Sequence, residues 1–427
     1  MKGLILAAPA SGSGKTTVTL ALLRALARAG IGIRAAKSGP DYIDPRFHEA
    51  ACGQPCVNLD AWAMSPARLR ALAAGDLPLI IEGAMGLFDG APPDGKGAVA
   101  DLARLLGLPV VLVVDAGKMA QSVAPLVAGF AHHDPEVKVA GVILNNVGSA
   151  RHYDMLTRAL APTGLPVLAA MPRRADLALP SRHLGLVQAA ETGALDDYLD
   201  HAAAILAAGV PDRPNPPLSD ILDLATRLLP APQAPRIAPP AQRIAVAYDE
   251  AFAFAYPHML EDWHAQGAEL STFSPLNDDP VPQTDFVFLP GGYPELHAGR
   301  IANAATFLKS LQRHAETRGI YGECGGYMVL GASLTDAEGV PHRMAGLLPL
   351  ATSFKKRQLH LGYRTVTADH GPFPGTHKAH EFHYATTLYT SGAHLFDAED
   401  AEGHALPPMG LIEGRVAGSF AHIIDRA

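Results

Sequence analysis

Hydrophobic residues in the first half of the chain gather in short continuous runs that alternate with longer amphipathic stretches. The runs cover residues 4–8, 77–82, 109–115 and 139–145. Near-continuous apolar runs of this length are typical of strands buried on both faces of a parallel sheet. Residues 16–29 instead carry Leu20, Leu23 and Leu26 at helical spacing, which predicts a helix. This alternation predicts an α/β fold with an open, doubly wound parallel sheet.

Proline interrupts this pattern in the middle of the chain. Residues 211–217 and 230–240 are rich in proline, which removes backbone donors and fixes φ, so these stretches predict a linker. A second alternating pattern restarts at Arg243 and continues with runs at 285–289 and 319–322. A chain of 427 residues also exceeds the usual size of one hydrophobic core. We therefore expect two domains, residues 1–235 and 236–427.

Composition and charge narrow the choice of partners. The net charge is −8 and the basic residues form no cluster, so nucleic acid is not expected as a partner. No apolar run approaches the ~20 residues that span a bilayer, so no membrane partner is expected. Three cysteines, Cys52, Cys56 and Cys324, are too few for a disulfide framework, which favours a cytoplasmic location. Cys52 and Cys56 have no second pair with which to bind zinc, and we interpret them as packing or loop residues.

A phosphate-binding loop follows the first predicted strand. The segment SGSGKTT places Gly12, Ser13, Gly14, Lys15, Thr16 and Thr17 between that strand and a helix. Small residues let backbone N–H groups point at phosphate, Lys15 adds a positive charge, and the Thr16 hydroxyl suits Mg²⁺. The segment departs from the Walker pattern at Pro9, a position that shapes the turn. We expect this loop to bind ATP together with Mg²⁺.

Acidic residues follow two further predicted strands. Lys37, Asp41 and Asp44 share the loop AAKSGPDYIDP, Glu82 ends an apolar run, and Asp89 lies in the glycine-rich loop after it. Because a buried carboxylate needs a facing cation, we interpret Glu82 as the Walker-B counterpart. Aspartate also favours turns for local reasons, which leaves a purely structural interpretation open for the three aspartates. Their convergence at one sheet edge favours a site in which Thr16, Asp44 and Glu82 bind metal, Lys37 binds nucleotide, and Asp41, Asp44 and Asp89 take part in catalysis.

Two other strand-to-loop segments carry polar residues. Asn145 and Asn146 could hold the edge of an adenine ring, although turn asparagines would look the same. Arg182 and His183 lie in the segment LPSRHLGLV, where either an anionic substrate or simple solvent exposure would explain them.

The second half of the chain contains a glycine-rich turn with a cysteine at its centre. Cys324 lies in GIYGECGGYM, where a short strand runs into glycines and then a predicted helix. Small neighbours permit the sharp turn that holds a nucleophile above a sheet, and the helix N-terminus is expected to lower the pKa of the Cys324 thiol. Gly291 and Gly292 follow another predicted strand, and their N–H groups would form an oxyanion hole.

The base that would serve Cys324 must be chosen among nineteen histidines. We favour His422 in VAGSFAHIID, which follows a strand-like run. The segment KAHEFHY is not a zinc motif, because its second histidine comes one residue too early for HExxH. Glu381 and His383 in that segment are candidate supporting groups for the base.

Taken together, these motifs resemble the cobyrinic acid and hydrogenobyrinic acid a,c-diamide synthase family. The matching segments are SGSGKTT, SGPDYIDP, EGAMGLFDG, PSRHLGLV, LPGGYPE, YGECGGYM, HEFHY and GSFAH, and they span the whole chain in the family's order. The resemblance implies a first domain similar to dethiobiotin synthetase and a second domain of the class I glutamine amidotransferase type. It also implies a corrinoid tetrapyrrole substrate, whose c and then a carboxylate are phosphorylated by ATP and attacked by glutamine-derived ammonia.

The resemblance assigns roles by motif. Cys324 would be the glutaminase nucleophile and His422 its activating base, while Lys15 and Thr16 would hold nucleotide and Mg²⁺. Class I glutaminases commonly show His-x-Glu, but Ile424 stands two residues after His422, which leaves the third triad member open.

Three alternative functions also stay open from sequence alone. They are a diamide synthase of another tetrapyrrole, cobyric acid synthase, and a non-enzymatic P-loop ATPase switch with a degenerate glutaminase domain. A homodimer is a further expectation from the resemblance.

Overall fold

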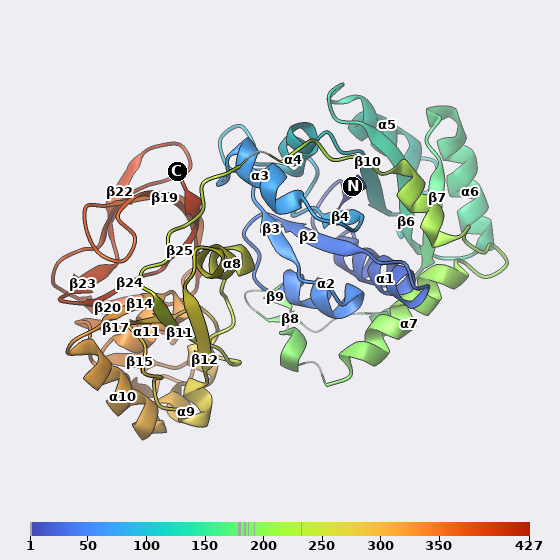
Figure 1. The fold of residues 1–427 in the computed structure, drawn as a ribbon. Coiled ribbons are helices and arrows are strands. Elements are labelled where there is room, and N and C mark those ends of the chain that lie inside the picture. The colour runs from blue at the N-terminus through green and yellow to red at the C-terminus, as the bar shows by residue number, and fades with distance from the viewer. Residues whose placement is uncertain (1, 178–180, 183–184, 187, 192, 232) are drawn as a thin grey trace. The chain divides into compact units, whose positions relative to one another are not determined.

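The computed structural model describes residues 2–177, 181–182, 185–186, 188–191, 193–231 and 233–427, without the side chains of 181–187 and 190. The chain divides into two compact units, Met1–Ala234 and Pro235–Ala427 (Figure 1). The division falls within the proline-rich stretch.

A mainly parallel sheet forms the centre of the first unit. Its strand order is β3-β2-β4-β1-β5-β6-β7, and the short β10 pairs antiparallel with the start of β1. The strands are β1 (Lys2–Ala7), β2 (Arg34–Ser38), β3 (Val57–Leu59), β4 (Leu79–Glu82), β5 (Val110–Asp115), β6 (Val139–Val147), β7 (Val167–Pro172) and β10 (Thr226–Arg227). A small separate hairpin pairs β8 (Ser181–Arg182) with β9 (Gly185–Leu186). The four apolar runs correspond to β1, β4, β5 and β6, so the predicted doubly wound parallel sheet is confirmed.

Helices on both sides bury the sheet. They are α1 (Lys15–Arg28), α2 (Asp44–Cys52), α3 (Pro66–Ala73), α4 (Val99–Leu106), α5 (Val123–His132), α6 (Ala150–Leu160) and α7 (Leu195–Ala208). Helix α1 packs against α2 and α7 on one side, and α3 contacts α4 on the other (Figure 1). Because both faces are covered, strand residues such as Ile5 and Val113 have no exposed surface, which is why these strands are continuous apolar runs.

The second unit is built around another sheet, with strand order β12-β11-β13-β14-β24-β23. All pairs in it are parallel except β23 with β24. Its strands are β11 (Arg243–Ala247), β12 (Glu269–Phe273), β13 (Phe286–Leu289), β14 (Gly319–Glu323), β23 (Leu411–Glu413) and β24 (Val416–Ser419). The helices of this unit are α8 (Pro257–Ala265), α9 (Ala298–Asn303), α10 (Ala305–Ala315) and α11 (Gly325–Leu330). The predicted α/β character of this half is confirmed.

Two further sheets complete the second unit. A four-stranded sheet has the order β16-β15-β17-β20, and a five-stranded antiparallel sheet has the order β22-β21-β18-β19-β25. These strands are β15 (Ser333–Thr335), β16 (Pro341–Arg343), β17 (Leu350–Ser353), β18 (His360–Ala368), β19 (Gly375–His383), β20 (Thr386–Thr390), β21 (Phe396–Glu399), β22 (Ala405–Met409) and β25 (Ala421–Arg426). Only Phe420 separates β24 from β25, so the chain passes directly from the central sheet into the antiparallel one. Across the described ranges, no helix combines the length and the apolar character that crossing a membrane requires.

Candidate active site

The phosphate loop connects β1 to α1 at the carboxyl edge of the first sheet. Gly14 adopts a φ of 82° immediately before α1. A Cβ on Gly14 would lie 2.0 Å from Nδ2 of Asn145, which itself donates to the carbonyl of Ser13 at 3.0 Å. Both the backbone conformation and the close approach therefore require glycine here. Asn145, near the end of β6, thus braces the loop from a strand two places away from β1 in the sheet.

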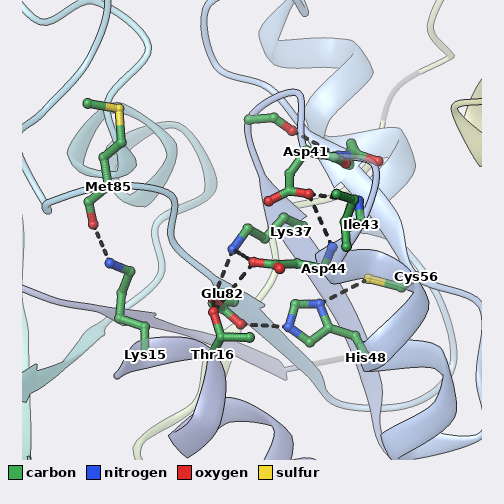
Figure 2. Close-up of polar contacts among 12 residues, drawn as sticks. Lys15, Thr16, Lys37, Asp41, Ile43, Asp44, His48, Cys56, Glu82 and Met85 are labelled. Carbon is green, nitrogen blue, oxygen red and sulfur yellow. Dashed lines mark hydrogen bonds and ion pairs between the residues drawn. The ribbon is translucent and has the colours of Figure 1, made fainter. Parts of the chain in front are cut away.

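The carboxylates predicted from separate loops meet beside this loop (Figure 2). Nζ of Lys37 lies 2.5 Å from Oδ2 of Asp44 and 2.8 Å from Oε1 of Glu82. The Thr16 hydroxyl donates to the same Glu82 oxygen at 2.6 Å. Because β1, β2 and β4 are adjacent parallel strands, their carboxyl ends bring the three segments together.

Burial and charge act against each other in this cluster. Burial by itself would lower the pKa of Lys37, but Asp44 and then Glu82 outweigh it, so that pKa is raised well above its ordinary value. Burial would likewise raise the pKa of Glu82, but Lys37 and then His48 hold it far below its usual range. The lysine and the carboxylate are therefore both charged at neutral pH, although their side chains are almost completely buried.

Asp41 supports the start of α2. One oxygen of its carboxylate accepts the N–H groups of Ile43 at 2.8 Å and Asp44 at 3.1 Å. Burial, together with the neighbouring Asp44 charge, raises the pKa of Asp41 to about 6. Asp41 can therefore change its protonation within the pH range in which many enzymes are assayed.

Lys15 reaches across the loop to the segment that follows β4. Its Nζ donates to the carbonyl of Met85 at 2.5 Å (Figure 2). Burial and then the nearby Lys37 lower the pKa of Lys15. An ammonium group that is poorly solvated and close to another cation is strongly stabilised by a phosphate anion.

His48 extends the cluster inward and was not selected from the sequence. Its Nε2 lies 2.6 Å from Oε2 of Glu82, and its Nδ1 lies 3.6 Å from Sγ of Cys56. The ring has no exposed surface. His48 is four residues after Asp44 on α2, so helical spacing places both on one face. This spacing of four residues is the sequence feature from which His48 could have been predicted. Cys56 is buried against His48, as a packing residue would be.

A cavity of about 430 Å³ opens over this cluster. It is lined by Ser11, Gly12, Gly14, Lys15, Thr16, Thr17, Lys37, Asp41, Asp44, Glu82, Gly83, Ala84 and Met85. Asp89 lies outside this lining and is exposed, and its carboxylate accepts the N–H of Gly86 at 2.9 Å. His183 falls outside the described residues, as does the side chain of Arg182.

The other asparagine considered for adenine, Asn146, has a φ of 58° and donates to Asp115 at 3.0 Å. Ser13 is buried and its hydroxyl donates to the carbonyl of Ala10 at 2.8 Å. The Ser13 contact lies within the phosphate loop, and the Asn146 contact joins β6 to the end of β5.

In the second unit, Cys324 occupies a tight turn between β14 and α11. Its backbone has φ 45° and ψ −101°, a conformation that residues with a Cβ rarely adopt and that often marks functional positions. The Cys324 N–H donates to the carbonyl of Ser419 at 2.8 Å. A Cβ on Gly326 would lie 1.9 Å from the carbonyl oxygen of Leu289, so the turn packs directly on β13 and needs glycine there.

Gly291 brings the histidine and the cysteine into the same place. A Cβ on Gly291 would lie 2.4 Å from Cε1 and 2.9 Å from Nε2 of His422, and 3.3 Å from Cβ of Cys324. The Nε2 edge of His422 therefore faces the side on which Cys324 lies. The backbone nitrogen of Gly292 is also close, 3.0 Å from the position that a Cβ on Gly325 would occupy. Cys324, His422, Gly291 and Gly292 are thus brought together.

The expected lowering of the Cys324 pKa is wrong. Burial, with a smaller contribution from the negative charge of Glu295, raises that pKa well above the ordinary value for a thiol. The helix that follows has only six residues, and a short helix cannot offset the removal of the sulfur from water. The resting sulfur is therefore a thiol, and a base must take its proton.

The two candidate supporting groups, Glu381 and His383, are paired with each other. Glu381 pairs with Arg364 at 2.8 Å and with His383 at 3.0 Å. Burial alone would raise the pKa of Glu381, but His383 and then Arg364 lower it to about 2. These side chains line a cavity of about 570 Å³. Of this motif, it is His380 that stands opposite His422 in the strand register.

A carboxylate does approach His422, and it comes from the residue directly before the cysteine. Oε2 of Glu323 lies 3.5 Å from Nδ1 of His422, and both side chains are 1% exposed. Class I glutaminases commonly place this acid two residues after the histidine, where this chain has Ile424. Glu323 was therefore not predicted, although it belongs to the GECGG segment.

Family models match both halves of the chain. Residues 4–187 match a CobQ/CobB/MinD/ParA nucleotide binding domain, and residues 243–426 match a CobB/CobQ-like glutamine amidotransferase domain. These matches fit the two sites described above.

Curated relatives match over the full length. The chain is 53% identical to a hydrogenobyrinate a,c-diamide synthase of Brucella anthropi, covering 100% of this chain and 99% of the relative. A protein of the same name from Rhizobium meliloti is also 53% identical with the same coverage, and one from Rhodobacter capsulatus is 52% identical, covering 99% and 98%. Among solved structures, a glutamine amidotransferase aligns with 37% of this chain and 80% of that chain, at 13% identity and a TM-score of 0.26, too low to add to the argument.

Proposed function

Because the chain belongs to the hydrogenobyrinate a,c-diamide synthase family, we propose that it amidates the a and c carboxylates of hydrogenobyrinic acid with ATP and glutamine. The observation that carries the proposal is that one chain holds two different sites. One is a phosphate loop beside a buried lysine–carboxylate cluster, and the other is a strained cysteine turn against a histidine. A carboxylate must be activated before an amine can displace its oxygen, so the two sites supply the two halves of one amidation.

In the first unit, the loop N–H groups and Lys15 would hold the phosphates of ATP. Thr16, Asp44 and Glu82 present a hydroxyl and two carboxylates, which are the hard oxygen ligands that Mg²⁺ prefers. A bound Mg²⁺ would neutralise charge on the phosphates. Lys37, held between the two carboxylates, would orient them. The product of this step is an acyl phosphate, formed when an oxygen of the tetrapyrrole carboxylate attacks the γ-phosphorus and ADP leaves.

In the second unit, His422 would take the Cys324 proton as the sulfur attacks the side-chain carbonyl of glutamine. The N–H groups of Gly291 and Gly292 would stabilise the negative oxygen that forms. The carbon–nitrogen bond then breaks, and the nitrogen leaves as ammonia with the proton returned by His422. Water hydrolyses the thioester to glutamate. The ammonia displaces phosphate from the activated carboxylate and forms the amide.

The decisive experiment is Cys324→Ser, assayed with glutamine and with ammonium chloride as nitrogen sources. We expect loss of glutamine-driven amidation and retention of ammonia-driven amidation. Cys52→Ser, which changes another buried cysteine, is the matched control and should keep both. If Cys324→Ser kept glutamine-driven amidation, the proposed division of labour would be wrong.

The metal content of the ring is tested separately. Hydrogenobyrinic acid and cobalt-containing cobyrinic acid are each incubated with the protein, ATP and glutamine, and product masses are compared. We expect the metal-free ring to be converted to its diamide. Conversion of the cobalt ring alone would move the assignment to a cobyrinic acid enzyme. EDTA should stop amidation from either nitrogen source, and Mg²⁺ should restore it, if Thr16, Asp44 and Glu82 bind this ion.

A further inference from the structure

The histidine opposite Cys324 has a buried carboxylate on its far side. Glu323 ends β14, and its side chain is 1% exposed. An ionised carboxylate is costly to bury without compensating partners. Its placement beside His422 therefore calls for a reason beyond packing.

Each oxygen of Glu323 faces its own group on β25. Oε1 accepts the N–H of Ile423 at 3.0 Å, while Oε2 lies 3.5 Å from Nδ1 of His422. The hydrogen bond from the Ile423 N–H restrains the carboxylate, so the second oxygen stays close to the imidazole. This arrangement joins the central sheet, which carries Glu323, to the antiparallel sheet, which carries His422.

The two nitrogens of His422 face different groups. Nε2 lies on the Gly291 side, where Cys324 also lies, and Nδ1 lies on the Glu323 side. A neutral imidazole accepts a proton at one nitrogen only if the other nitrogen carries the hydrogen. A carboxylate at Nδ1 keeps the hydrogen there, leaves Nε2 free to accept the Cys324 proton, and stabilises the imidazolium that forms.

The other ionisable groups around the pair do not duplicate this contact. His380 faces His422 from β19, and burial lowers its pKa to about 3, so it is neutral. Glu295 and Glu381 act on Cys324 through their charge, and Glu381 is held by Arg364 and His383. Glu323 also bears on the sulfur through its charge, but its carboxylate lies beside the ring of His422.

We propose that Glu323 is the positioning residue of the glutaminase site, which sets the tautomer of His422 and supports its protonated form. It would take the part that a glutamate two residues after the histidine plays in other class I glutaminases. The histidine would then be oriented by the residue that immediately precedes the nucleophile. This inference rests on the proposed glutaminase role of Cys324.

The test is Glu323→Gln, which removes the charge but keeps an oxygen that can accept the Ile423 N–H. We expect kcat for glutamine hydrolysis to fall by about 10²–10⁴-fold, with the KM for glutamine changed by less than about threefold. Ammonia-driven amidation should be unchanged. The acidic limb of the pH profile of kcat/KM should move to lower pH, because the imidazolium loses its stabilising carboxylate. Glu323→Asp keeps the charge at a shorter reach and should recover part of kcat.

Glu381→Gln is the matched control, because it removes another buried carboxylate that acts on Cys324. It should not reproduce the shift of the acidic limb. Wild-type kcat and an unmoved acidic limb in Glu323→Gln would overturn the inference. So would a change confined to KM. If Cys324→Ser abolishes glutamine hydrolysis while Glu323→Gln does not impair it, only this inference fails, whereas an active Cys324→Ser variant refutes the proposed function itself.

A second measurement covers the case in which Glu323→Gln does not fold. The imidazole ¹⁵N signals of wild-type protein labelled at histidine are compared with those of His422→Gln to assign His422. A hydrogen on Nδ1 supports the inference. A hydrogen on Nε2 in the resting protein contradicts it.

Discussion

At the scale of single residues, Lys37 determines the electrostatics of the first site. It is the cation that lies between Asp44 and Glu82, and both carboxylates are largely removed from water. The sequence predicted all three in one site, with Lys37 and Asp44 in a loop after one strand and Glu82 at the end of another. The shared loop is wrong, because Lys37 lies within β2 and Asp44 is the first residue of α2. The sequence could not show that they form a direct ion pair, since pairing depends on side-chain reach and on strand register.

Lys37→Met should therefore destabilise the first unit as well as abolish amidation from either nitrogen source. Removing one partner of a buried ion pair leaves an uncompensated charge, which costs ~3–5 kcal/mol. Urea unfolding followed by circular dichroism measures the loss. The double variant Lys37→Met with Asp44→Asn should recover part of the stability, and a fully stable single variant would show that solvent reaches the carboxylates.

Asp41 predicts a pH dependence of stability. Its pKa is raised to about 6 from an ordinary value of 3.8, so the native state binds the proton more tightly than the unfolded state does. Its contribution is present below pH 3.8 and is lost as the pH rises through 6. Asp41→Asn keeps an acceptor for the N–H groups of Ile43 and Asp44 but does not ionise.

The stability of Asp41→Asn relative to the wild type should increase by about 1.4 kcal/mol between pH 5 and pH 7.5. Urea denaturation at a series of pH values measures this difference. Asp89→Asn, a change at an exposed aspartate, is the control. A constant difference across the series would show that the Asp41 carboxyl is not perturbed.

At the scale of elements, the glycine-rich turns after β13 and β14 decide the geometry of the second site. The apolar runs at 285–289 and 319–322 were sufficient to predict both strands. The two smaller sheets were not predicted, because several of their strands are partly exposed and carry no continuous apolar run, and bulges interrupt some of the pairings. His422 was selected by its motif, but its contact with Glu323 depends on how β25 docks beside β14, which no local pattern shows.

Gly291→Ala should remove glutaminase activity, because the new Cβ would lie 2.4 Å from the His422 ring. We expect a decrease of at least about 100-fold in glutamine hydrolysis, since misplacing a catalytic group by about 1 Å has an effect of this size. Ammonia-driven amidation should persist. Gly299→Ala is the matched control. Gly299 lies in α9, and a Cβ added there would be 3.4 Å from the nearest atom. Retained hydrolysis in Gly291→Ala would show that the ring can move without loss.

At the scale of the whole molecule, each unit carries its own site. The sequence predicted both sites because the motifs follow strands at the carboxyl edges of parallel sheets, where such folds place their chemistry. It did not supply His48, whose one signal is its helical spacing from Asp44, or Glu323, because the contacts of both depend on how distant segments pack together. Both are buried groups that orient another side chain.

Lys15→Ala tests the independence of the units. It should abolish amidation with glutamine and with ammonia, since both routes need the phosphate loop. Basal hydrolysis of glutamine, followed as glutamate release without ATP, should stay within about threefold of wild type, because Cys324 and His422 belong to the other compact unit. Complete loss of basal hydrolysis would mean that the phosphate site controls the glutaminase.

The lysine held between two acids also limits how related sequences can diverge. A lineage that loses Lys37 alone keeps two repelling anions in its interior, and a lineage that loses one acid alone keeps an excess of positive charge close to Lys15. Either intermediate is less stable than both the starting and the fully neutral arrangements, and the neutral one would also lose the proposed Mg²⁺ ligands. Substitutions at these positions should therefore appear together among descendants or not at all.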